Sequence, residues 1–186
     1  DLVWYGSSLD RAELFDRLQY LEPSEDFRTT WQYQNLMFMT AGHLCEVVGG
    51  ATWEELVRSR ILQPLGMNGS NLSVSDSQKA ADFAVPYVEA DDVNGAVPFR
   101  QIDSMAPAGA INSNADDMAR WLIFNLGSGL APPATGTAPG SSSGSGASTA
   151  SDNSAGAAAK PLLTPGSLAR LHEPRMVMPS TSTLLP

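Results

Sequence analysis

A tyrosine and an asparagine two residues apart are the side chains whose types and spacing could do chemistry in this sequence. They are Tyr33 and Asn35, in the stretch Trp31-Gln-Tyr-Gln-Asn35. Alternate side chains of an extended segment point to the same side, so the phenol and the carboxamide would project together, with Gln34 opposite. A rigid helix following directly would hold both in place, which is how functional sites are usually supported.

Each of these residues also has a purely structural interpretation. Tyr33 could be a packed aromatic side chain at the start of a helix. Asn35 is a good N-cap residue, because its side-chain oxygen can accept from free backbone N–H groups of the first turn. Capping and contact with a substrate do not exclude each other, since the oxygen could cap while the NH₂ group points outward.

The segment after Asn35 is the element that must position the pair. In residues 36–48 the only charged side chain is Glu46, and Gly49-Gly50 follows. A helix that is apolar almost all round is typically buried, and glycine commonly ends a helix in the left-handed conformation. We therefore predict a buried helix over residues 35–49, with His43 a core histidine with satisfied hydrogen bonds and Cys45 a small apolar core residue.

Other helices are indicated by capping patterns. Asp10-Arg-Ala-Glu13 and Thr52-Trp-Glu-Glu55 have the form of capping boxes, and Thr164-Pro165 suits a helix start. Together with the central helix, the predicted helices cover residues 10–21, 35–49, 53–62, 114–127 and 165–172.

The remaining patterns predict faces and loops. On the fourth helix the predicted buried stripe is Met118, Ala119, Leu122, Ile123 and Leu126, and Trp121 is expected to pack in the core or on a helix face. Residues 68–79 are predicted to be a loop. Residues 83–88 and 97–102 are predicted to be edge strands or extended loop, because Pro86 and Pro98 cannot lie in the middle of a sheet.

Composition excludes several kinds of protein. The formal net charge of −9 argues against nucleic-acid binding, which needs clustered Lys and Arg. A single cysteine cannot form an internal disulfide, and no His, Cys and Asp cluster has metal spacing, so neither metal nor cofactor is expected. No apolar run has the length of a membrane span. The compartment is not indicated.

Two surface features stand apart from the helices. Residues 131–160 consist almost entirely of Ala, Gly, Ser, Thr and Pro, and so are predicted to be a disordered insertion within one domain of residues 1–186. Asn68 and Asn71 each begin a glycosylation-type triplet, whose use the sequence leaves open.

Several motifs together carry a family resemblance. Tyr33-Gln-Asn35 is followed by Ile61-Leu-Gln-Pro-Leu-Gly-Met67 and by Pro107-Ala-Gly-Ala-Ile-Asn-Ser113. In order and spacing they resemble the middle of β-lactamase-related serine hydrolases, which include class C β-lactamases, D-alanyl-D-alanine peptidases and esterases. The resemblance implies an α+β fold, an α/β sandwich with a helical subdomain, of which this chain covers mostly the helical part. Because it does not begin with Met and starts as though within a loop, we expect an internal piece of a longer protein.

The resemblance also implies roles for the site residues. In this family a Ser-x-x-Lys pair supplies the nucleophile and a cation, Tyr-x-Asn supplies the base and a substrate contact, and a Lys-Thr-Gly or His-x-Gly strand lines the far wall. Tyr33 is thus expected to be the catalytic base and Asn35 the substrate-binding residue. The other two elements are absent, since neither Lys79 nor Lys160 lies in such a motif.

The implied function is hydrolysis of a small ester, amide or peptide (lactam, peptide or ester) through an acyl-enzyme, with this chain inactive by itself. A free phenol has a pKa of about 10 and is a poor base unless cations stabilise the phenolate, and the nearest cation in sequence is Arg28. The alternative is a non-catalytic interaction module that kept the helical scaffold. A Ser-x-x-Lys motif upstream of Asp1 would favour the enzyme.

Overall fold

A computed structural model describes residues 3–127, 129–131 and 161–175. The predicted insertion therefore lies almost wholly outside the described residues, as does the chain after residue 175. In chain order the elements are α1 (Arg11–Arg17), η1 (Leu18–Tyr20), α2 (Asn35–Gly49), α3 (Trp53–Val57), η2 (Arg58–Leu62), α4 (Gln63–Leu65), α5 (Val74–Ser77), β1 (Tyr87–Ala90), β2 (Val93–Ala96), η3 (Asp103–Met105), α6 (Ala106–Gly109), α7 (Ala115–Leu126) and α8 (Pro165–His172).

The local capping signals place the helix ends as predicted. Both capping boxes are formed, with Asp10 and Glu13 at α1 and with Thr52 and Glu55 at α3. The Thr164 side chain caps α8. Gly50 ends α2 with φ of 67°, a conformation that costs glycine nothing because it has no Cβ. The predicted helices over 10–21, 35–49, 114–127 and 165–172 are confirmed to within a residue or two at each end.

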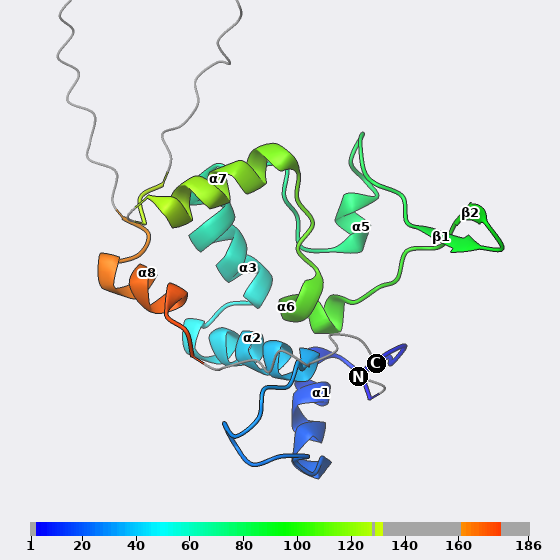
Figure 1. The fold of residues 1–186 in the computed structure, drawn as a ribbon, viewed down its shortest axis with the longest axis horizontal. Coiled ribbons are helices and arrows are strands. Elements are labelled where there is room, and N and C mark those ends of the chain that lie inside the picture. The colour runs from blue at the N-terminus through cyan, green and yellow to red at the C-terminus, as the bar shows by residue number, and fades with distance from the viewer. Residues whose placement is uncertain (1–2, 128, 132–160, 176–186) are drawn as a thin grey trace, which may run out of the picture.

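The described residues form two small hydrophobic cores on either side of α2 and α3, which lie next to each other in Figure 1. The first core is formed by residues of α1, α2 and η3. The second is formed by residues of α3, η2, α4 and α7 and of the loop after α4. The buried side chains of the first are Leu14, Leu36, Met39 and Met105. Those of the second are Val57, Leu62, Leu65, Met67, Leu72 and Phe124.

Helix α2 is less buried than its composition predicts. Only Leu36, Met39 and Gly42 are buried, whereas Leu44, Val47 and Cys45 are exposed. The prediction of a helix buried on all sides was therefore wrong, and so was the core position of Cys45. The reason is that α1, α3 and α6 contact α2 on some of its faces only, and the described residues place nothing over the rest.

Helix α7 buries a different face from the one predicted. Phe124 and Asp117 are buried and Trp121 packs against the second core, as expected of that tryptophan. The stripe predicted to be buried, which includes Met118 and Leu122, is exposed instead. Both stripes have helical spacing, so only the position of the neighbouring α4 decides which one is covered.

The helix that begins at Trp53 continues past the proline at which it was predicted to stop. It changes to a π-helical turn over η2, where the Gln63 amide donates to the Arg58 carbonyl, and runs on through α4 to Leu65. Pro64 lacks an amide hydrogen, so the ordinary hydrogen-bond ladder cannot pass through it. The wider turn lets the chain remain helical there.

Residues 68–79, predicted to be a loop, contain the short helix α5 and are anchored by buried polar contacts. The Asp117 carboxylate accepts from the Gly69 amide at 2.9 Å and from the Ser70 hydroxyl at 2.7 Å. The Asn71 carboxamide oxygen accepts from Ser77 and Asn112, both at 3.1 Å.

The two strands form an antiparallel hairpin whose residues are all exposed. It projects away from the helices in Figure 1. Strand β1 overlaps the end of the first segment predicted to be extended, at Tyr87 and Val88, whereas β2 ends just before the second. The rest of both segments is loop, the alternative to strand in that prediction. Asp91 and Asp92 both have positive φ, 53° and 60°, as the tight turn of a two-residue hairpin requires.

A close approach between α2 and α6 gives a testable expectation at Gly42. A Cβ there would lie 2.2 Å from Pro107 Cγ and 3.3 Å from Trp53 Cδ1. Gly42→Ala is therefore expected to lower the free energy of unfolding by about 1–3 kcal/mol, the usual cost of overpacking, measured by urea denaturation. Gly166→Ala in α8 is the matched control, because its Cβ would meet nothing within 4 Å. A Gly42→Ala protein as stable as the original would contradict this packing.

Candidate active site

Tyr33 lies in solvent directly before the rigid start of α2. Its side chain is 62% exposed, and its ring centroid lies 6.3 Å from that of Phe38. The residues after it are firmly held, since Leu36 and Met39 are among the most buried in the chain. The structure thus presents the phenol to solvent from an anchored support, and Tyr33 is not a packed core aromatic.

The cap of α2 is Gln34 and not Asn35. The Gln34 backbone is extended, with φ −150° and ψ 108°, and its side-chain oxygen accepts from the Leu36 amide at 3.2 Å. Asn35 is the first helical residue, so the capping interpretation of Asn35 was wrong. Among the described residues its carboxamide has no hydrogen-bond partner, and both of its polar groups remain available to a ligand.

The described residues place no activating cation at the Tyr33 hydroxyl. Arg28, the nearest in sequence, lies with its guanidinium 5.1 Å from the centroid of the Phe27 ring. Lys79 pairs with Asp76 at 2.9 Å on the exposed end of α5. Among the described residues, Tyr33 therefore lacks the charged neighbours that a phenol needs to act as a base.

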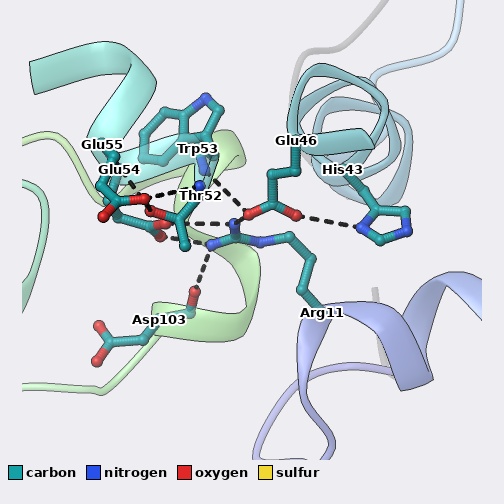
Figure 2. Close-up of polar contacts among 8 residues, drawn as sticks. All are labelled: Arg11, His43, Glu46, Thr52, Trp53, Glu54, Glu55 and Asp103. Atoms are coloured by element: carbon teal, nitrogen blue, oxygen red, sulfur yellow. Dashed lines mark hydrogen bonds and ion pairs between the residues drawn. The ribbon is translucent and has the colours of Figure 1, made fainter. Parts of the chain in front are cut away.

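A partly buried charge network, which sequence reasoning missed, joins α1, α2 and α3. Figure 2 shows the Arg11 guanidinium of α1 between Glu46 of α2 and Glu54 of α3. Arg11 Nη2 donates to Glu54 at 2.6 Å and to the Asp103 carbonyl at 3.2 Å. Because it links α1 and α2 of the first core to α3 of the second, this network helps to hold α2, and the residues before it, in place. The partners lie 35 to 92 residues apart in sequence, so no local pattern indicates them.

His43 belongs to the same network. Its Nδ1 lies 3.1 Å from a Glu46 oxygen, and its ring packs against Phe15 with a centroid distance of 4.8 Å. The side chain is 21% exposed. It is therefore a partly buried histidine with a satisfied hydrogen bond, close to the prediction, and it takes no part in the Tyr33 site.

Opposing effects set the charge states in this network. Burial alone would raise the pKa of the Glu46 carboxyl, but the Trp53 amide, His43 and Arg11 together lower that pKa below its ordinary value of 4.5. Burial likewise opposes the charge of Arg11, yet its contacts with Glu54 and Glu46 outweigh burial and raise the Arg11 pKa. Both groups are therefore ionised across the neutral range.

The lowered pKa of Glu46 predicts how stability depends on pH. A carboxyl with a depressed folded-state pKa stabilises the protein above its unfolded value, and this contribution is lost as pH falls below about 4.5 through the folded pKa. Glu46→Gln should therefore show a shallower loss of stability on acidification than the original protein, measured by urea midpoints at a series of pH values. The exposed Glu89→Gln in β1 should leave the slope unchanged, and equal slopes for all three proteins would contradict the assignment.

Other kinds of site are not found in the described part of the chain. Those residues contain no group of three or more His, Cys, Asp and Glu side chains that could hold a metal ion. No helix among them is long and apolar enough to cross a membrane.

The motifs around Tyr33 agree with a comparison against known families. Residues 2–166 match the family model described as Beta-lactamase. The chain belongs to the β-lactamase family. The family assignment and the α+β, mostly helical fold expected from the resemblance are thereby confirmed.

Individual relatives and a solved structure each match between 61% and 67% of the chain. An unguisins hydrolase of Aspergillus campestris is 32% identical over 124 residues, 65% of this chain and 23% of that protein. Gigasin-6 of Magallana gigas is 28% identical over 117 residues, 61% of this chain and 39% of that protein. The class C β-lactamase of Rhodobacter sphaeroides superposes with a TM-score of 0.55 at 25% identity, over 67% of this chain and 34% of that one. The chain thus spans well under half the length of these relatives.

Proposed function

We propose that the protein containing this chain is a serine hydrolase that cleaves esters or amides through an acyl-enzyme. In this proposal Tyr33 is the general base and Asn35 holds the substrate carbonyl. The observation that supports it is the exposed phenol beside an unpartnered carboxamide, both carried on the anchored start of α2. A relative that is itself described as a hydrolase, the unguisins hydrolase, also supports hydrolysis as the reaction.

The proposal requires groups beyond the 186 residues. Lowering the pKa of a phenol by two to three units takes about 3–4 kcal/mol of preferential stabilisation of the phenolate. Nearby cations usually supply it, and the Ser-x-x-Lys element that would bring both cation and nucleophile is absent from the sequence. The coding sequence on either side of the chain tests this directly. A Ser-x-x-Lys motif upstream of Asp1 is expected, and its absence would overturn the proposal.

The second candidate is a non-catalytic interaction module on the same scaffold. It is favoured by the missing nucleophile and by the large apolar side chains exposed on α2 and α7, among them Val48 and Leu126. A flanking sequence without Ser-x-x-Lys would support this candidate.

The chain by itself is expected to have no hydrolase activity. A fluorophosphonate probe should not label it, and it should give no burst with chromogenic lactams or p-nitrophenyl esters, because an unactivated hydroxyl is a weak nucleophile. Probe incorporation is read by mass spectrometry, with an active class C β-lactamase labelled in parallel as the positive control. Stoichiometric labelling of the folded chain would mean that it contains a nucleophile other than the one proposed.

A further inference from the structure

A groove lies between the end of the first helix and the start of α2. The chain from Leu21 to Trp31 folds back across it, and the Ser24 hydroxyl donates to the Gln32 side chain at 3.1 Å. Its volume is about 630 Å³, within the range of natural ligand sites. The roles proposed for Tyr33 and Asn35 do not explain this groove, because neither residue lines it.

The groove is close to the proposed reaction site but faces another way. Gln32 and Gln34 line it, whereas the alternate residues Tyr33 and Asn35 do not, as expected where alternate side chains of an extended segment point to opposite sides. Gln34 also caps α2, so one side of the groove is as firmly anchored as the helix itself.

Large apolar side chains make up much of the lining. Several of them remain accessible, including Phe27 at 88% and Met37 at 52% exposure. The apolar lining residues are Leu18, Leu21, Phe27, Trp31, Leu36 and Met37. An occupant with an aromatic or aliphatic part would remove this surface from water, which is favourable.

The groove is lined by carboxylates that have no ion-pair partners in the described part of the chain. Glu22, Glu25 and Asp26 line it, and in the described part of the chain none of the three has an ion pair. The one cation in the lining, Arg28, lies over the Phe27 ring. Three carboxylates and one guanidinium leave a net charge of −2.

These features restrict the chemistry of an occupant. An anion would be repelled, and a neutral apolar molecule would gain nothing from the exposed carboxylates. A bare metal ion does not fit, because the described residues hold no group of carboxylates close enough together to ligate one. A cation attached to an apolar body meets both the charge and the apolar lining.

We propose that this groove binds a peptide segment in which lysine or arginine alternates with an aromatic or aliphatic residue. The proposal goes beyond hydrolysis and does not depend on it, because binding here requires neither a nucleophile nor an activated Tyr33. The two proposals can therefore fail separately: a protein without hydrolase activity could still bind such a peptide, and a hydrolase could lack this binding.

The test is titration of the 186-residue chain with acetyl-Leu-Lys-Phe-Lys-amide, followed by calorimetry and by tryptophan fluorescence. Saturable binding is expected, weakening as salt is added, since exposed charges are screened. Glu25→Gln and Asp26→Asn should each weaken it about three-fold, the size of a partly exposed ion pair. In Trp31→Phe the fluorescence change should disappear while the calorimetric signal remains, which would place the peptide at Trp31.

Matched probes separate groove binding from general attraction to an acidic chain. Asp91→Asn in the distant hairpin changes the net charge equally and should leave the affinity unchanged. The peptide with Gln in place of both Lys should bind about ten-fold more weakly, the loss of two exposed ion pairs. The peptide with Glu should bind more weakly still, because like charges then face each other. Equal affinity for the glutamine peptide, equal weakening by Asp91→Asn, or no saturable binding would each overturn the proposal.

Discussion

Replacing Arg11 with alanine is expected to lower the free energy of unfolding by about 2–4 kcal/mol. The Arg11 side chain is 12% exposed and its guanidinium lies between the Glu46 and Glu54 carboxylates. Removing one partner of a fully buried ion pair costs about 3–5 kcal/mol. The expected loss here is somewhat smaller, because Glu46 and Glu54 are 20% and 29% exposed and Glu46 keeps its contacts with the Trp53 amide and His43. Here two carboxylates would be left facing each other, with the Asp103 carbonyl also losing its donor.

Arg17→Ala on the same helix provides the control, since that side chain is exposed and has no ion pair within the described part of the chain. Urea denaturation of the three proteins at neutral pH gives the comparison. Because the network joins both cores, we also expect Arg11→Ala to broaden the transition. A loss of stability no greater than that of Arg17→Ala would mean that the network contributes nothing net.

Replacing Tyr33 with phenylalanine should have the largest effect on activity. In a protein that joins this chain to a Ser-x-x-Lys element, the substitution is expected to reduce the acylation rate by about 10²–10⁴, the range typical of losing a general base. Folding should be almost unchanged, because only a hydroxyl on a 62% exposed side chain is removed. Single-turnover kinetics measure the acylation step directly.

Two companion variants make this result interpretable. Tyr20→Phe removes a hydroxyl from a tyrosine that is 78% exposed in η1 and should leave the rate unchanged. Asn35→Ala should lower the rate without loss of stability, since Gln34 and not Asn35 caps α2. Acylation by Tyr33→Phe within a few-fold of the original rate would remove Tyr33 from the mechanism.

Features that depend on a few neighbouring residues could be predicted from the sequence. The capping boxes at Asp10 and Thr52 and the left-handed Gly50 lie where their local chemistry puts them. A cap is a hydrogen bond between residues two or three positions apart, so it forms wherever those residues occur at a helix start. The family motifs around Tyr33 are local in the same sense.

The choice of buried face could not be predicted from periodicity. Helix α7 has one stripe with Phe124 and another with Met118, and both repeat with the helical period. Which of them is covered depends on the direction from which α4 approaches. In the same way the composition of α2 predicts burial all round, although only some of its faces have neighbours among the described residues.

The sequence by itself determined the family, the helices and the adjacency of Tyr33 and Asn35, because these follow from short stretches of chain. The Gln34 cap of α2 is also a local contact, two residues apart, which was missed because asparagine is the more usual cap residue. The tertiary structure decided the long-range contacts. It alone brought Arg11 to Glu46 and Glu54. Such contacts join residues 35 to 43 positions apart, and their energies depend on burial and distance, which no local pattern specifies.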